Sequence, residues 1–404
     1  MENNTLIKNS PLETRTLLLA LYIQFSFINL AAPISTYGTE LLGIFLITAF
    51  AISCEWQACK QHIPVVFAIT FFIVAISFIH HLNLPHTEIL WPITIRTLFW
   101  IFAAFLSYPY FQKITKRNLE AILACLIIIN SFLVFIQFIS LYAFNYNIDF
   151  SLLIGGVNSR TQFNNLYRPT GLTAEPAFLA GYLFGLVTLL FILKKKSCIA
   201  TCFGISAIML SMSFWGILAV SSLVFISLFN ISTENRRLVI NKNEKIILLF
   251  FITAALVIYF AQEFGRPAQT IEATQPRPSV ENIFTGKDAS NSAKIDTFKN
   301  MLNSPYLLML GYGFTSNSKT SPPFYEGLYD VTFFGANIST FGVPLGVLID
   351  IFTLWLLFKK SSFDHKGKIL CVVALSKIST PTRIFFPCFI LLLFIANKKT
   401  TEDT

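Results

Sequence analysis

The sequence predicts an all-α polytopic integral membrane protein, with about twelve transmembrane segments and two large loops on the outer face of the membrane. The first observation is composition: of 404 residues, 54% are hydrophobic and 13% are charged, and the mean hydropathy is +0.64. A soluble domain has about 45–50% apolar and about 25% charged residues, and its core could not enclose so much apolar surface. These values exclude an ordinary cytosolic enzyme, a secreted disulfide scaffold and a disordered chain.

The second observation is that the apolar residues gather in runs, and one membrane crossing needs about 20 of them. On this criterion we expect helices near 16–36, 40–53, 64–79, 91–111, 120–142, 176–193, 197–212, 213–229, 246–261 and 340–358. A last apolar stretch, 369–396, is divided by polar residues at 377–383. Because it is too short for two full crossings, it holds either two short tilted helices or a re-entrant hairpin.

The third observation is that lysine and arginine collect in alternate loops, of which examples are 113–117, 194–196 and 359–368. The intervening short loops hold none, at 37–39, 80–90 and 211–216. Because cytoplasmic loops are enriched in Lys and Arg, we expect both termini in the cytoplasm and an even number of crossings. The net charge of +9 then reflects membrane anchoring rather than nucleic-acid binding. We expect the whole chain, 1–404, to form a single transmembrane domain.

Two predicted outer loops, 143–175 and 262–338, are much longer than the about 12–15 residues of an ordinary connection, and such loops are usually functional or disordered. In the second loop, Ile295, Phe298 and Leu302 share one helical face. We therefore expect a short amphipathic helix near 292–302, lying along the membrane surface.

The first long loop ends with a carboxylate beside a proline, Glu175-Pro176, at the start of a predicted helix. Proline suits a first helical turn, and the carboxylate either caps the helix or projects from its end. Arg168 precedes it and forms a cationic pair with Arg160. Guanidinium groups offer the forked donors that suit pyrophosphate, although a solvated loop face explains these arginines equally well.

The second long loop supplies further cations and a second acid, which are Arg266, Arg277, Lys294 and Asp330. The paired glycines of Gly311-Tyr312-Gly313 allow a sharp turn or a close approach to a ligand. The segment lacks the lysine and serine that end a phosphate-binding P-loop.

A charged residue inside a predicted span costs free energy, because the membrane interior solvates charge poorly, so each one is a candidate functional residue. We expect Arg96 to face a buried polar cavity rather than the outer headgroups. Asp350 either serves a function or pairs with a neighbouring cation, and the sequence leaves both open. Lys377 and Arg383 flank the polar break in the last apolar stretch. The His, Cys, Asp and Glu residues show no metal-ligand spacing, so no metal or other cofactor is expected.

Four sequence motifs, in this order, are similar to those of a known family. Arg-Pro-Thr-Gly-Leu-Thr-Ala-Glu-Pro (168–176) is similar to an Arg-x-x-Gly-x-x-x-Glu-Pro signature, and Ser-Met-Ser-Phe-Trp-Gly (211–216) to a Ser-x-Ser-x-x-Gly turn. Residues 292–313 are similar to an amphipathic helix with a following Gly-x-Gly segment, and 341–346 open a late helix. The chain resembles the bacterial O-antigen polymerase family, within the wider group that includes the O-antigen ligases.

The chain also departs from the wider group at three positions. Related ligases often carry Arg where this chain has Phe214, and relatives often carry Arg where it has Lys294. Ligases also carry His after the Gly-x-Gly segment, where this chain has only Asp330 and Asn337. The missing His favours a polymerase over a ligase.

The resemblance implies a metal-independent glycosyltransferase of lipopolysaccharide biosynthesis in the bacterial inner membrane. It would transfer the growing glycan from undecaprenyl diphosphate to an incoming undecaprenyl-diphosphate-linked repeat unit at the periplasmic face. Glu175, or second Asp330, would take the proton of the acceptor hydroxyl. The cations that would bind the diphosphate are Arg160, Arg168, Arg266, Arg277, Arg96 and Lys294. Beyond the lipid-linked oligosaccharide and the bilayer, a chain-length regulator protein is an expected partner.

The alternatives are an O-antigen ligase and a flippase or transporter of lipid-linked oligosaccharides. Transporters place polar groups and broken helices near the middle of the membrane. Here the polar candidates concentrate at the outer edge, which favours the enzyme.

Overall fold

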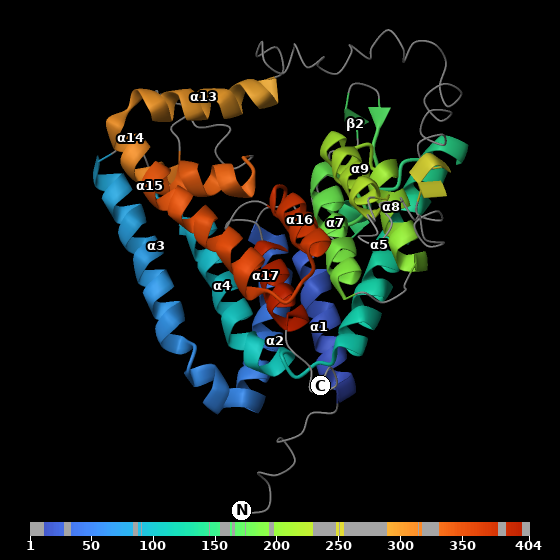
Figure 1. Cartoon of the computed structure of the whole chain (residues 1–404), viewed down its shortest axis with the longest axis horizontal. Helices are drawn as coiled ribbons and strands as arrows, with labels where there is room; N and C mark the ends of the chain where they lie inside the picture. Colours follow the sequence, from blue (N-terminus) through green and yellow to red (C-terminus); the bar gives the residue numbers. More distant parts are fainter. Residues whose placement is uncertain are drawn as a thin grey trace, which may run out of the picture.

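Figure 1 shows the computed structural model: apolar helices stand side by side, and two shorter helices, α13 (Ala289–Asn303) and α14 (Pro305–Leu310), lie at the top of the view. We call this the upper end of the bundle and the opposite end the lower end. The residues that the structure describes are 12–27, 34–83, 88–89, 91–144, 146–153, 162–163, 166–173, 175–193, 198–228, 248–249, 251–253, 289–313, 315–316, 331–378 and 385–397.

The first five helices are α1 (Leu12–Phe27), α2 (Ile34–Lys60), α3 (Ile63–Asn83), α4 (Trp91–Phe111) and α5 (Lys116–Phe144). α4 has the predicted bounds, and α5 contains the helix predicted at 120–142. The loop predicted at 37–39 is wrong, because α2 runs through it, and α3 continues into the loop predicted at 80–90. A few polar or small residues do not end a helix that satisfies its backbone hydrogen bonds internally.

Between α5 and α7 (Pro176–Ile192) lie the one-turn helix α6 (Phe150–Leu153) and an antiparallel strand pair, β2 (Gln162–Phe163) with β3 (Leu166–Tyr167). α8 (Cys198–Leu210) and α9 (Phe214–Leu228) follow α7, and all three helices begin within about one residue of the predicted position. Of the helix predicted at 246–261, the structure describes only 248–249 and 251–253, which are helical.

α7 is the centre of the bundle, since most of its residues are buried and it contacts α5, α8, α9, α16 (His365–Leu375) and α17 (Phe385–Ala396). A Cβ atom added at Gly204 of α8 would lie 2.7 Å from Cγ2 of Val187, so α8 packs with its backbone directly against α7. Small residues at helix contacts are the usual means of close packing in membranes.

The C-terminal part begins with the helix predicted near 292–302, which the structure contains as α13. Strand β4 (Thr315–Ser316) pairs antiparallel with β1 (Glu88–Ile89), so the segment after α14 contacts the α3–α4 connection. α15 (Phe333–Trp355) continues into a π-helical turn, η2 (Leu356–Lys360). The start predicted at 340 is wrong: the helix begins at Phe333 and is broken at Gly342.

The last apolar stretch forms two short helices, α16 and α17, of 11 and 12 residues. α16 rises beside α7, since Gly367 lies against Ile192 at the lower end of α7 and Lys377 lies against Gly181 nearer its upper end. α17 returns to the lower end, where the side chain of Asn397 accepts a hydrogen bond from the backbone N–H of Ser362 at 2.6 Å.

Among the described residues, three helices have the length and composition of a membrane span, at Leu42–Lys60, Lys116–Phe144 and Phe333–Lys360, the last of which is broken at Gly342. Shorter apolar helices accompany them. Large apolar side chains face outward: on α3, for example, Phe67 is 62% exposed and Phe71 is 77% exposed. Broad exposed apolar faces of this kind are typical of contact with lipid. The chain is therefore a membrane-embedded helical protein.

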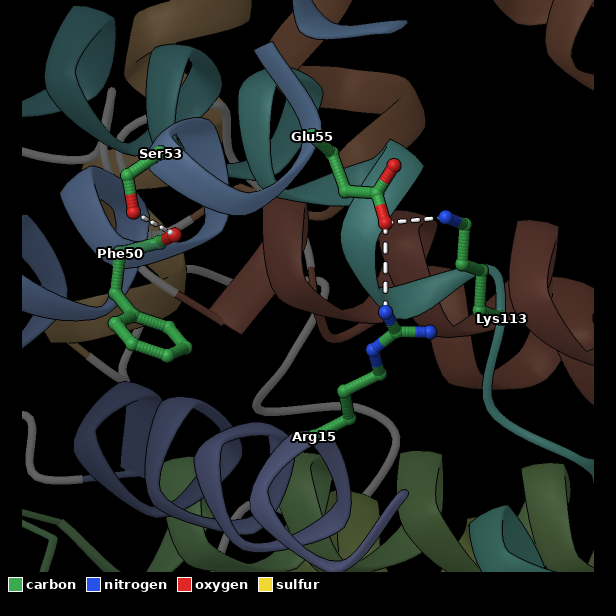
Figure 2. Close-up of polar contacts among 5 residues, drawn as sticks. All are labelled: Arg15, Phe50, Ser53, Glu55 and Lys113. Carbon is green, nitrogen blue, oxygen red and sulfur yellow. Dashed lines mark hydrogen bonds and ion pairs between the residues drawn. The ribbon is translucent and has the colours of Figure 1, made fainter. Parts of the chain in front are cut away.

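At the lower end, an ion cluster joins α1, α2 and the residues after α4 (Figure 2). The Oε1 atom of Glu55 accepts from Arg15 Nη2 at 3.4 Å and from Lys113 Nζ. Glu55 is at a non-helical position inside α2, with φ −131° and ψ 36°. The guanidinium of Arg15 also lies over the ring of Tyr110, 5.0 Å from its centroid.

Candidate functional site

The loop that leads into α7 is held against α5 by one buried side chain. Gln137 is fully buried, and its Oε1 accepts hydrogen bonds from the backbone N–H groups of Thr170 at 3.0 Å and Gly171 at 2.8 Å. Its Nε2 donates to the carbonyl of Ile148 at 3.2 Å. A single amide therefore fixes two parts of the first long loop, as buried backbone groups require a partner.

The same loop turns tightly between Thr170 and Glu175. Gly171 has φ +58°, a region that favours glycine, and a Cβ there would lie 3.2 Å from Leu179 of α7. The hydroxyl of Thr173 lies 2.8 Å from the carbonyl oxygen of Thr170 and 2.9 Å from that of Glu175, both within donating distance. These bonds place the loop directly over the first turn of α7.

Glu175 is the N-cap residue of α7, in extended conformation, and its side chain makes no capping hydrogen bond. Of the two predicted roles, cap or projecting carboxylate, the structure therefore excludes the cap. Its carbonyl oxygen instead accepts from the N–H groups of Phe178 and Leu179. Arg168 lies in the same loop, half-buried, with its Nε atom buried.

The Ser-Met-Ser turn between α8 and α9 lies beside α7. Met212 adopts a positive φ of 49°, and Ser213 Oγ accepts from the N–H of Gly216 at 3.3 Å. A Cβ at Gly216 would lie 2.8 Å from Ala180, so the beginning of α9 contacts α7 one to two turns after Glu175. The structure thus brings together two of the four motifs that carry the family resemblance.

The end of α16 joins this group of residues. Trp215 Nε1 donates to Ser376 Oγ at 3.2 Å, and the Ser376 hydroxyl donates to the carbonyl of Val373 at 2.7 Å. The next residue, Lys377, has its Nζ 5.8 Å from the ring centroid of Phe178. Sequence reasoning named Lys377 as an intramembrane charge but did not place it in the site, because nothing in the spacing relates it to α7.

The Gly-Tyr-Gly segment after α14 contacts protein backbone. The N–H groups of Tyr312 and Gly313 donate to the carbonyl oxygens of Ser339 at 2.7 Å and Thr340 at 2.8 Å. These carbonyls lie just before the break of α15 at Gly342, which has φ +81°. The segment therefore satisfies backbone groups near a broken membrane helix, as such breaks require.

The break folds the first part of α15 back on the second. A Cβ at Gly346 would lie 2.5 Å from Cα of Ile338, and Asn337 Nδ2 donates to Asp350 Oδ1 at 2.7 Å. Both polar side chains are buried. Among the described residues, the hydrogen-bond partner of Asp350 is thus the amide of Asn337.

The remaining predicted site residues lie in parts that the structure does not describe or describes only as backbone. Arg160, Arg266, Arg277 and Asp330 are outside the described residues. Arg96 is on α4 and Lys294 on α13, and their side chains are outside the description. The site that can be described therefore consists of Arg168 and Glu175 with the supporting residues Gln137, Trp215 and Lys377.

Comparison of the chain with protein-family models, with curated proteins and with solved structures finds no match. The resemblance to O-antigen polymerases rests on the motifs quoted above and stays a prediction.

Proposed function

We propose that this protein is an O-antigen polymerase. It acts in the bacterial inner membrane, with both termini in the cytoplasm, and joins lipid-linked repeat units at the periplasmic face. The donor is a growing glycan on undecaprenyl diphosphate, and the acceptor is an undecaprenyl-diphosphate-linked repeat unit. A chain-length regulator is the expected protein partner.

In the proposed reaction, the hydroxyl oxygen of the acceptor sugar forms a bond to the anomeric carbon of the donor chain. The bond from that carbon to the diphosphate oxygen breaks, and its electron pair leaves with undecaprenyl diphosphate. The proton of the hydroxyl passes to the carboxylate of Glu175, acting as general base. The guanidinium of Arg168 stabilises the charge that develops on the leaving diphosphate.

The observation that carries the proposal is the position of Glu175 at the start of α7 without a capping bond. A carboxylate at that position normally gains stability by capping. Buried Gln137 holds the backbone of the loop that carries this carboxylate, and a general base needs a defined position, so Glu175 is suited to this role.

The proposal includes further candidates, of which all but Arg96 on α4 belong to the two predicted long loops. Asp330 is the second choice for the base. The other cations for the diphosphate are Arg160, Arg266, Arg277, Arg96 and Lys294.

Deletion of the gene tests the function through the lipopolysaccharide pattern on a gel. A polymerase predicts single repeat units on the lipid A core. Complete loss of capped core would instead indicate a ligase, and repeat units trapped in the cytoplasm would indicate a flippase.

Arg168→Ala and Glu175→Ala test the site in the complemented deletion strain. Each is expected to give the single-repeat pattern while the protein remains inserted, as judged by the membrane fraction. Glu120→Ala, which changes a carboxylate at the lower end of α5, is the matched control and should give normal chains. Normal chain length in both site variants would end the site assignment.

One observation favours a transporter as second candidate. A broken helix with a buried carboxylate is a common feature of transporter sites, and α15 has both at Gly342 and Asp350. Asp350→Asn removes the charge and keeps an oxygen that can accept from Asn337. A polymerase should keep its chain-length pattern in this variant, whereas a transporter that binds a coupling cation at Asp350 should lose transport.

A further inference from the structure

Lys377 follows the last turn of α16, and its side chain is directed along α7. Its Cγ atom lies 2.9 Å from the position that a Cβ at Gly181 would occupy, so the aliphatic stem crosses α7 where that helix has no side chain. Its Nζ lies 5.8 Å from the ring centroid of Phe178. Any other residue at position 181 would meet the lysine stem.

The direction of this side chain leads toward the catalytic candidates. Phe178 lies about one turn before Gly181 on α7, so the two are neighbours on the helix surface, and Glu175 is the N-cap residue of the same helix. The stem of Lys377 lies at Gly181 and its ammonium group reaches Phe178. The charge is therefore directed to the upper end of α7, where the loop with Arg168 and Glu175 ends.

The backbone that carries Lys377 is fixed on both sides. Ser376 accepts from Trp215 Nε1 at 3.2 Å, and the N–H groups of Lys377 and Ile378 donate to the carbonyl of Ala374 at 3.1 and 3.0 Å. The side chain of Ile378 is buried and lies against Gly185. A cation held on such a backbone is preorganised, which lowers the entropic cost of binding an anion.

A lysine near the end of a helix can serve structure alone, by bonding carbonyl groups of the last turns. Lys368 on the same helix is such a residue: it is buried, and its Nζ donates to the carbonyl of Phe358 at 2.8 Å. Lys377 differs because its stem crosses to another helix and its ammonium group lies beside an aromatic ring there.

We propose that Lys377 binds the diphosphate of the polyprenyl-linked substrate, as a cation supplied by the end of α16 rather than by either long loop. The inference rests on the proposed polymerase function. Lysine acts as a point charge on phosphate, so it complements the forked donors of Arg168. Because α16 packs against α7, the diphosphate site is then built from segments far apart in the sequence.

The test uses the full-length protein in detergent and measures binding of farnesyl diphosphate, a short polyprenyl diphosphate, by calorimetry. Lys377→Met keeps an unbranched stem across Gly181 but removes the charge, whereas Lys377→Arg keeps the charge. Loss of a charged hydrogen bond predicts at least about tenfold weaker binding for Lys377→Met and near-normal binding for Lys377→Arg. Lys366→Met, on the same helix at its other end, is the matched control and should bind normally.

A competition arm distinguishes the diphosphate from ordinary phospholipid headgroups. Phosphatidylglycerol at equal concentration should not displace farnesyl diphosphate; equal competition would overturn the proposal, because the lysine would then be a general headgroup contact. Unchanged binding in Lys377→Met would also overturn it, as would a loss of binding that Lys377→Arg does not restore.

The outcome is separable from the fate of the proposed function. The deletion strain could fail to show single repeats while Lys377→Met still weakens farnesyl diphosphate binding. That result would refute the polymerase function and support the diphosphate site at Lys377. If the deletion strain shows single repeats but the Lys377→Met protein makes normal chains and binds farnesyl diphosphate normally, only the proposed role of Lys377 is refuted.

Discussion

Substitution of Gln137 by Met should release the loop that carries Arg168 and Glu175. The change keeps an unbranched side chain of similar length but removes the oxygen that accepts from Thr170 and Gly171. Both donors are in buried residues. A buried donor left without a partner costs about 1–3 kcal/mol, so two donors give about 2–6 kcal/mol of lost local stability.

Hydrogen exchange measured by mass spectrometry on the detergent-solubilised protein reports this local stability. Since about 1.4 kcal/mol corresponds to a tenfold change, the lower bound of about 2 kcal/mol predicts at least about 30-fold faster exchange at 166–173. Exchange in α8 should stay unchanged, because α8 does not depend on these bonds.

Gln137→Glu provides the contrast, since a carboxylate still accepts from both N–H groups but no longer donates to Ile148. It should leave exchange at 166–173 much closer to that of the wild type than Gln137→Met does. Exchange within about threefold of wild type in a folded Gln137→Met protein would refute the reasoning, because it corresponds to less than about 1 kcal/mol.

Four further substitutions should change stability, each followed by the midpoint of thermal unfolding in detergent. Gly342→Ala should destabilise by at least about 2 kcal/mol, because its φ is +81° and its Cβ would lie 2.2 Å from the carbonyl oxygen of Met309. Glu55→Gln should lower stability by about 1–3 kcal/mol, since it leaves Arg15 without its carboxylate; Lys113→Met should cost less, about 0–1 kcal/mol, because that side chain is 46% exposed. Tyr312→Phe should cost about 1–3 kcal/mol, because its buried hydroxyl donates to a backbone carbonyl of α13 at 2.8 Å.

Each of these has a result that contradicts it. An unchanged midpoint for Gly342→Ala would mean that α15 and α14 can separate freely. A Lys113→Met protein less stable than Glu55→Gln would reverse the assigned order of the two ion pairs. A neutral Tyr312→Phe would mean that its hydroxyl finds an equal partner elsewhere.

The positions of many helices along the chain follow from the sequence, because each membrane helix consists of a run of apolar residues. The bounds of α4 and the starts of α7, α8 and α9 needed only the length of apolar segments and their polar ends. Prediction failed at 37–39, where α2 continues through residues that were expected to form a loop. It also failed in α15, where the helical residues before the break at Gly342 were not expected.

The candidate site divides in the same way. Glu175 and Arg168 stand close together in the sequence, so a local motif could identify them. Gln137, Trp215 and Lys377 are far from that motif along the chain, and their relation to it depends on how α5, α9 and α16 pack around α7. No periodicity or spacing encodes such contacts.

By itself, then, the amino-acid sequence determined that this protein belongs in a bilayer and which short segments carry acids and cations, because hydropathy and local motifs are properties of neighbouring residues. Only the tertiary structure decided that Glu175 does not cap its helix, that a buried glutamine holds its loop, and that a lysine at the end of α16 reaches along α7. The physical reason is that close helix packing, allowed by residues such as Gly181 and Gly216, brings together groups whose separation along the chain carries no signal.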